Sequence, residues 1–258
     1  MVITSHFLIL MKIHQINGYI QNIFLIEYDH GLFLLDGCAK ADVETVAEFV
    51  TKKLKRPITD LKLVVVTHMH PDHAGGAHKF RRLFNCKIVS ANVPGHWYQG
   101  WDGILMHWTD LALTQWVAKR RQQPRKSVYY PRKLKADILL DDGDRIPGFE
   151  AWQVLNTQGH TDRDLSLYNE SVGKIYIADL LVRVKGKLVP PFPVFYPRRY
   201  RESIERLRAM KDVDVLMAHG PQTRICEDEF TTILKIAPKV PMTHWRSTKA
   251  KFKKAFFS

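Results

Sequence analysis

Hydrophobic positions along the chain alternate between short β-rich runs and longer segments with helical spacing. Residues 19–28 and 32–35 are β-rich and flank the turn signal Asp29-His30-Gly31, so they predict a hairpin. Residues 41–54 repeat apolar side chains at helical spacing and predict a helix. The unbroken apolar run within residues 61–67 predicts a strand that is buried on both faces.

The same alternation returns in the second half of the chain. We expect helices at residues 200–210 and 227–236, and strands at residues 151–156, 165–168, 174–177 and 213–217. Strands that alternate with helices predict an α/β fold, here a single domain over residues 1–258.

Residues 94–135 fit this alternation poorly and are rich in Trp, Tyr, Lys and Arg. We interpret them as an insertion. Its apolar residues either form core or a lid beside the active site, or line an apolar wall for an acyl or aromatic group. The side chains concerned are Trp101, Met106, Trp108, Leu111, Leu113 and Trp116.

Charge adds a preference for anionic partners. The net charge is +13, from 39 basic and 26 acidic residues, and residues 119–135 and 239–258 contain no Asp or Glu. Such an excess favours acidic metabolites, membrane surfaces or nucleic acid as partners, or else these stretches form only a solvated basic surface. In the basic tail, residues 239–258, Trp245, Phe252 and Phe256 would share one side of a helix. That helix either packs on the domain or rests on an anionic membrane.

The cellular context is indicated by cysteine usage and by the first residues. Cys38, Cys86 and Cys226 are odd in number and lack CxxC spacing, which argues against a disulfide framework. The apolar run at residues 7–11 is too short to span a membrane and lacks a signal-peptide pattern, so we expect a strand there. These features predict a cytoplasmic protein without a transmembrane segment.

Candidate metal ligands are concentrated directly after the buried strand of residues 61–67. His68, His70, Asp72 and His73 form an HxHxDH run, and Gly75-Gly76 follows it. Imidazole and carboxylate groups suit zinc and similar cations. A structural role explains one isolated histidine well, but it explains this cluster poorly.

Further ligand-type residues follow other predicted strands. His160 lies in Gly159-His160-Thr161, Asp179 follows the strand at 174–177, and His219 follows the strand at 213–217. Each metal needs about three protein ligands plus an open position. With the HxHxDH run, these residues make a set large enough for two metals.

With these motifs in order, and Asp36 ahead of them, the chain resembles the metallo-β-lactamase superfamily from about Ile13 to about Pro221. The resemblance implies an αββα sandwich with metals at one edge of its two sheets. One metal would be held by His68, His70 and His160, and the other by Asp72, His73 and His219. Asp179 would bridge the metals, and Asp36 would orient the HxHxDH loop, unless it is a simple turn residue.

The chemistry implied is hydrolysis by a metal-bound hydroxide, with two divalent ions, zinc foremost and iron or manganese as alternatives. Asp72 would orient the hydroxide and carry its proton. Asp179 points to the glyoxalase II-like and lactonase-like branch, so we expect a small carbonyl substrate, either anionic or neutral, such as an ester, thioester, lactone or amide. Alternatives are a β-lactamase and a nuclease or phosphodiesterase that uses the basic insertion, although no recognised nucleic-acid motif is present.

Overall fold

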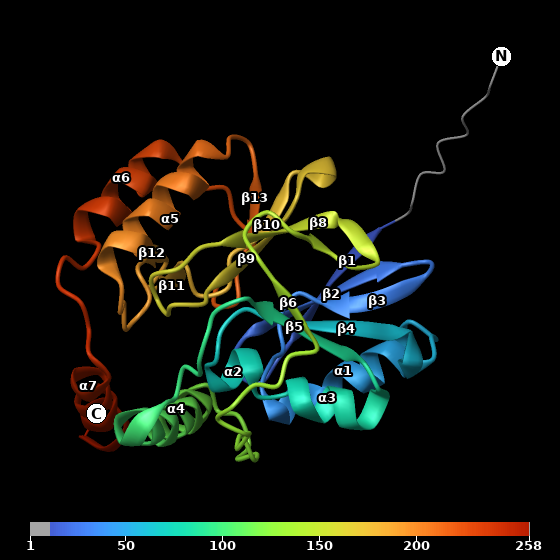
Figure 1. The fold of residues 1–258 in the computed structure, drawn as a ribbon, viewed down its shortest axis with the longest axis horizontal. Coiled ribbons are helices and arrows are strands. Elements are labelled where there is room, and N and C mark those ends of the chain that lie inside the picture. Colours follow the sequence, from blue (N-terminus) through green and yellow to red (C-terminus); the bar gives the residue numbers. More distant parts are fainter. Residues whose placement is uncertain (1–10, 258) are drawn as a thin grey trace.

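Two β-sheets stack face to face, and helices cover the outer face of each sheet (Figure 1). The computed structural model describes the backbone of residues 11–257 and the side chains of residues 11–250. These four layers form the αββα sandwich that the sequence predicted. Apart from Met11, the strand expected at residues 7–11 lies outside the described residues.

The first sheet has six strands in the order β1-β2-β3-β4-β5-β6. Its first three strands pair antiparallel, and β3 to β6 pair in parallel. Tyr28 pairs with Gly31, which places the hairpin turn where the sequence predicted it. The strands are β1 Lys12–Asn17, β2 Asn22–Tyr28, β3 Gly31–Leu34, β4 Leu61–Val66, β5 Lys87–Ala91 and β6 Ile138–Leu140.

The second sheet has five strands in the order β13-β10-β9-β8-β7. Within it β10 and β13 pair in parallel, and the other neighbours pair antiparallel. Its strands are β7 Arg145–Ile146, β8 Phe149–Asn156, β9 Leu165–Asn169, β10 Lys174–Tyr176 and β13 Asp214–Leu216. A separate hairpin of β11 Val182–Val184 and β12 Lys187–Val189 lies between β10 and the last helices in sequence.

The apolar run of β4 is unbroken because this strand is covered on both faces. Leu63 and Val65 pack between the two sheets, whereas Val64 and Val66 belong to the core under the helices. Successive side chains of a strand point to opposite faces, so a strand with two covered faces needs apolar residues throughout. Trp152 of β8 is fully buried and packs against the first sheet through Phe33, at 5.8 Å between ring centroids.

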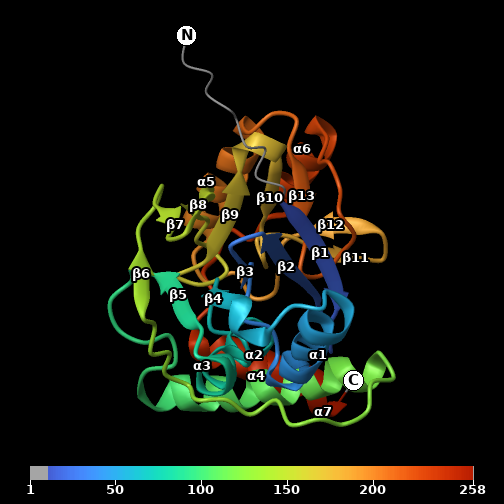
Figure 2. The same ribbon diagram turned by 90° about the vertical axis from the view of Figure 1, so that its right-hand side faces the viewer.

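Helices α1, α3 and α4 cover the first sheet, and α5 and α6 cover the second (Figure 2). The helix expected at residues 41–54 is divided into a 3-10 turn, α1 and a π-helical turn at Phe49–Lys53. The last turn widens because Leu54 N–H donates to Phe49 O at 3.0 Å, one residue further back than in an α-helix. The helices are α1 Val43–Glu48, α2 Pro71–Ala74, α3 Ala77–Phe84, α4 Gly100–Arg120, α5 Pro197–Ala209, α6 Glu227–Ile236 and α7 His244–Phe257.

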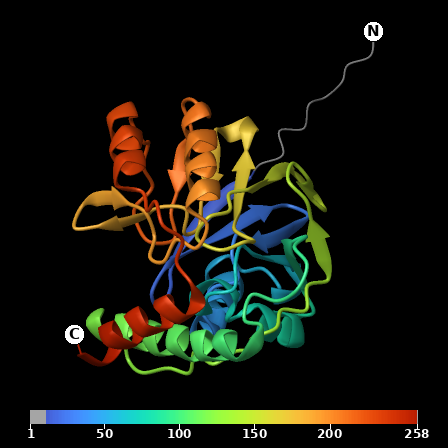
Figure 3. The same cartoon turned by 60° about the vertical axis from the view of Figure 1, so that its left-hand side comes forward.

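Residues 94–135 contain a regular element, the helix α4, which is 21 residues long. The helix α7 lies alongside α4 (Figure 3), and its His244 Nδ1 is 3.1 Å from Asp102 Oδ2. The tail therefore packs on the domain, one of the two interpretations drawn from the sequence. Phe252 and Phe256 lie outside the side chains that the structure describes.

A buried carboxyl at the start of α1 provides a test of the fold. Asp42 is buried and accepts a hydrogen bond from Tyr19 N–H at 2.7 Å. Burial raises the pKa of Asp42 to about 6. Because this folded-state pKa lies above the unfolded value of about 3.9, the folded state holds the Asp42 proton more tightly than the unfolded state does. Stability is therefore lost as pH rises from about 4 to about 6.

Asp42→Asn keeps the acceptor and removes the charge. We expect the variant to be up to about 3 kcal/mol more stable than the parent at pH 7, with most of the gain lost near about pH 4. Urea unfolding at the two pH values measures the difference. An equal effect at both pH values would contradict the role assigned to the charge.

Candidate metal centre

The ligand-type residues predicted from the sequence converge where the carboxyl ends of β4, β8, β10 and β13 meet. The loop after β4 carries His68 and His70, and the short helix α2 that follows carries Asp72 and His73. His160, Asp179 and His219 follow strands of the second sheet. Strand ends at one edge of a sandwich bring residues that are distant in sequence into one site.

Three histidine nitrogens form the first group. His70 Nδ1 lies 3.1 Å from His68 Nε2 and 2.9 Å from His160 Nε2. Asp179 Oδ2 lies 3.8 Å from His68 Nε2 and 3.6 Å from His160 Nε2. These four side chains therefore present their donor atoms to one common point.

Asp72, His73 and His219 form the second group. Asp72 Oδ2 lies 3.1 Å from His219 Nε2 and 3.6 Å from His73 Nε2. The other carboxylate oxygen of Asp179, Oδ1, lies 3.3 Å from His73 Nε2 and 3.4 Å from His219 Nε2. Asp179 thus turns one oxygen to each group.

The donor spacing fits a tetrahedrally coordinated metal. Ligand atoms about 2.05 Å from a zinc ion are separated by about 3.3 Å at the corners of a tetrahedron. The separations given above run from 2.9 to 3.8 Å, and within each group the donor atoms all lie within 4.8 Å of one another. Nitrogen and carboxylate donors are also the ligand types that zinc and related cations take in proteins.

The charge of the cluster favours cations as well. Burial lowers the pKa of His68 well below its usual value, and the neighbouring His73 adds to this, so His68 is neutral and its ring nitrogen can bind a metal. Burial raises the pKa of Asp179, but His73 and His219 outweigh it and hold that pKa well below its usual range. A buried carboxylate that stays ionised attracts a cation.

Asp36 holds the loop after β4 in place through contacts from both of its carboxylate oxygens. Its Oδ1 accepts from Gly37 N–H at 2.9 Å and from Thr67 N–H at 3.2 Å. Its Oδ2 accepts from the hydroxyls of Thr67 at 2.8 Å and Tyr176 at 3.0 Å, and lies 2.5 Å from His73 Nδ1. Because His73 Nδ1 is engaged by Asp36, its Nε2 is directed to the second group.

Other histidines of the cluster are held in the same way. His68 Nδ1 lies 3.2 Å from Thr67 Oγ1, and His160 Nδ1 lies 2.5 Å from Pro193 O. Each of these contacts fixes the ring orientation and leaves Nε2 to the first group. The geometry is the one expected of metal-binding imidazoles.

Sequence reasoning missed Asp110, which supports His70. Asp110 is a buried residue of α4, and its Oδ2 lies 3.7 Å from His70 Nε2. Tyr98 OH donates to the same oxygen at 2.9 Å and to Met69 O at 3.1 Å, and Tyr130 OH also donates to Met69 O. In the sequence Asp110 stands between the apolar residues Trp108 and Leu111, but its burial depends on how α4 packs.

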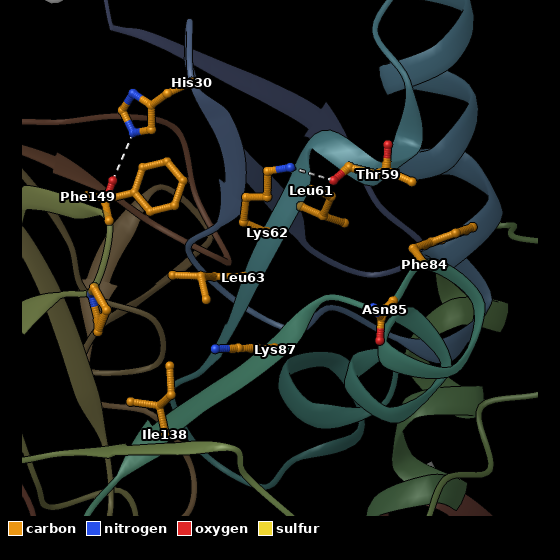
Figure 4. Close-up of a pocket in the computed structure, with 12 residues that line it drawn as sticks. His30, Thr59, Leu61, Lys62, Leu63, Phe84, Asn85, Lys87, Ile138 and Phe149 are labelled. Atoms are coloured by element: carbon orange, nitrogen blue, oxygen red, sulfur yellow. Dashed lines mark hydrogen bonds between the residues drawn. The ribbon is translucent and has the colours of Figure 1, made fainter.

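A surface pocket of about 470 Å³ lies at the other end of β4 and β5 (Figure 4). Leu61 and Leu63 line it near the start of β4, about 15–20 Å of strand before the ligand loop. Its His30 and Lys62 already bind the backbone carbonyls of Gly148 and Thr59, at 2.8 and 2.9 Å. This pocket is therefore separate from the metal-type cluster.

Comparison with known proteins agrees with the geometry. A model of the metallo-beta-lactamase superfamily matches residues 16–219. The probable metallo-hydrolase YflN of Bacillus subtilis (strain 168) is 24% identical over 230 residues, which cover 81% of this chain and 83% of YflN. The probable metallo-hydrolase YqjP of the same organism is 27% identical over 134 residues, 48% of this chain, and the match spans only 41% of YqjP.

Solved structures show the same fold. A metallo-beta-lactamase family protein from Thermus thermophilus superposes with a TM-score of 0.61 at 18% identity, covering 87% of this chain and 78% of the other. Fold and donor cluster together define the class, a metal-dependent hydrolase. Since the family model covers well over half of the residues, the chain belongs to the metallo-β-lactamase superfamily, as its motifs predicted.

Proposed function

We propose that this protein is a dinuclear metal-dependent hydrolase of small carbonyl substrates, namely esters, thioesters, lactones or amides. Asp179 is the observation that carries the proposal. Its Oδ2 faces His68 and His160, and its Oδ1 faces His73 and His219. A carboxylate shared in this way is suited to bridging two cations.

In this proposal His68, His70 and His160 hold one ion and Asp72, His73 and His219 hold the other. The donors favour zinc, with iron or manganese as alternatives. When bound, two such ions would supply a nucleophile from water at neutral pH and would polarise the substrate carbonyl.

Asp72 is the residue that we assign to proton transfer. Burial raises the pKa of its carboxyl, but His73 and His219 outweigh burial and lower that pKa overall. Asp72 is therefore ionised at neutral pH and can accept a proton from an attacking water. Its place between two imidazoles also fixes the direction of its oxygens.

Exposure indicates the side from which a substrate approaches. The side chains of His68, His160 and His73 are at most 2% exposed, whereas those of Asp179 and His219 are 13% and 18% exposed. The cluster is therefore closed where His68, His160 and His73 lie, and open at Asp179 and His219. The net charge of +13 favours an anionic substrate at that opening.

Metal analysis paired with a substrate screen tests the proposal. The purified protein is expected to contain about two equivalents of transition metal. We expect it to hydrolyse members of an ester, thioester and lactone panel, to lose activity with a chelator and to regain it with zinc. Nitrocefin and single-stranded RNA are included to test the β-lactamase and nuclease alternatives. Full activity of a metal-free preparation would exclude the proposal, and turnover of RNA alone would favour a nuclease.

Asp110→Asn tests the support that α4 gives to His70. The variant is expected to bind metal about 10-fold more weakly, because the neutral amide orients the imidazole less firmly. Competition with a chromophoric chelator measures the affinity. Asp102→Asn is the control, since Asp102 lies on the same helix but is exposed and contacts His244 instead of the cluster. Equal affinities for the two variants would remove Asp110 from the site.

A further inference from the structure

The solvent-facing side of α4 carries large apolar residues. Trp101 is 85% exposed, Leu105 48% and Trp108 58%. Their spacing of four and three residues places them on one stripe of the helix. The opposite side, with Met106 and Leu111, is buried in the core under the first sheet. A helix that only covers a sheet has polar residues on its outer side, so this stripe needs another explanation.

Two further exposed aromatic residues lie on segments next to α4. Tyr129 is 53% exposed, and its ring centroid lies 5.9 Å from that of Trp108. Trp245 of α7 is 64% exposed, and α7 lies along α4 (Figure 3). We call Trp101, Leu105, Trp108, Tyr129 and Trp245 the α4–α7 ridge.

Cations accompany the ridge. Lys40 Nζ lies 6.0 Å from the ring centroid of Tyr129 in the ridge. At the C-terminal end of α4, outside the ridge, the Arg120 guanidinium lies 4.8 Å from the ring centroid of Trp116. Residues 121–137 leave the end of α4 and run back beneath it (Figure 2). Residues 119–135 hold eight Lys or Arg and no acid. The acid at the start of α4, Asp102, pairs with His244.

We propose that the α4–α7 ridge docks this protein on an anionic lipid surface. Indole and phenol rings combine an apolar body with a polar group and are favoured at the membrane interface. Lys and Arg beside them are attracted to anionic headgroups. The ridge combines exposed aromatic rings with nearby cations on the outer side of the helices that cover the first sheet.

Charge and shape favour lipid over other occupants. A second copy of the chain would bring the same cations face to face, at a net charge of +13 per chain. Single-stranded nucleic acid is bound in grooves where bases stack on aromatic platforms. The ridge instead follows the outside of a helix and includes the aliphatic Leu105.

Sedimentation of the 258-residue chain with vesicles tests this inference, which does not rest on the proposed hydrolysis. The protein is expected to bind vesicles of phosphatidylglycerol and phosphatidylcholine, to bind pure phosphatidylcholine much less, and to be released by salt. Trp101→Ser/Trp108→Ser is expected to lower the partition coefficient about 10-fold or more. Leu139→Ser/Val172→Ser is the matched control, because both residues are exposed and lie outside α4 and α7.

Three outcomes would overturn the inference. The first is no binding to anionic vesicles at low salt. The second is a dimer in analytical ultracentrifugation that the tryptophan double variant dissociates, which would assign the ridge to self-association. The third is tighter binding to a fluorescent single-stranded RNA than to vesicles, weakened by the same variant. Circular dichroism melts of both double variants confirm that they are folded.

Discussion

Asp179→Ala is expected to lower the metal content from about two equivalents to one or less and to reduce kcat/KM by about 10³-fold or more. The reason is that this carboxylate faces both donor groups, with oxygens 3.3–3.8 Å from four imidazole nitrogens. Its removal takes one donor from each group and leaves the imidazoles without a shared anion. Elemental analysis and steady-state kinetics on the same preparation measure both effects.

Asp228→Ala provides the control for that experiment, because Asp228 is an exposed acid in the first turn of α6. Its variant should retain metal and activity. If Asp179→Ala kept about two equivalents of metal and ordinary turnover, the two groups would not share this residue, and the dinuclear proposal would be wrong.

Asp72→Ala is expected to lose most of its turnover, about 10²- to 10⁴-fold, while it keeps a cooperative thermal melt. Asp72 lies in the short helix α2 and not in the strands that build the core, so the fold does not depend on it. The loss in kcat should exceed any change in KM, since the residue acts on the proton and not on substrate binding. Thermal melts and kinetics on metal-loaded protein check both parts.

Asp72→Asn separates the two roles of this side chain. The amide keeps an oxygen donor but cannot accept the proton. A variant with both metals and near-normal turnover would rule out proton transfer by Asp72. A variant that lost its metal together with its activity would assign Asp72 to metal binding alone.

The donor residues could be predicted because their signal is local. His68 to His73 occupy six consecutive positions, and His160, Asp179 and His219 each follow an apolar run that ends at the same edge of the fold. Apolar runs and helical spacing likewise predicted most strands and helices. The ligand motifs and the hydrophobic patterns are both contained in short stretches of sequence, so a single sequence is enough to recognise them.

The helix α4 was not predicted because both of its sides are apolar. The buried side carries Met106 and Leu111, and the exposed side carries Trp101, Leu105 and Trp108. Helical periodicity is visible only when polar residues mark the outer side. The contact of Asp110 with His70 was hidden for the same reason, since it depends on where this helix packs.

Each donor group takes residues from both halves of the sandwich. His68 and His70 follow the first sheet while His160 follows the second, and Asp72 and His73 are completed by His219. A bound ion would therefore act as a cross-link between the two halves, and the halves could not part without breaking coordination. Loss of metal would then speed the opening of the sheet interface, so metal supply would set the lifetime of the folded protein as well as its chemistry.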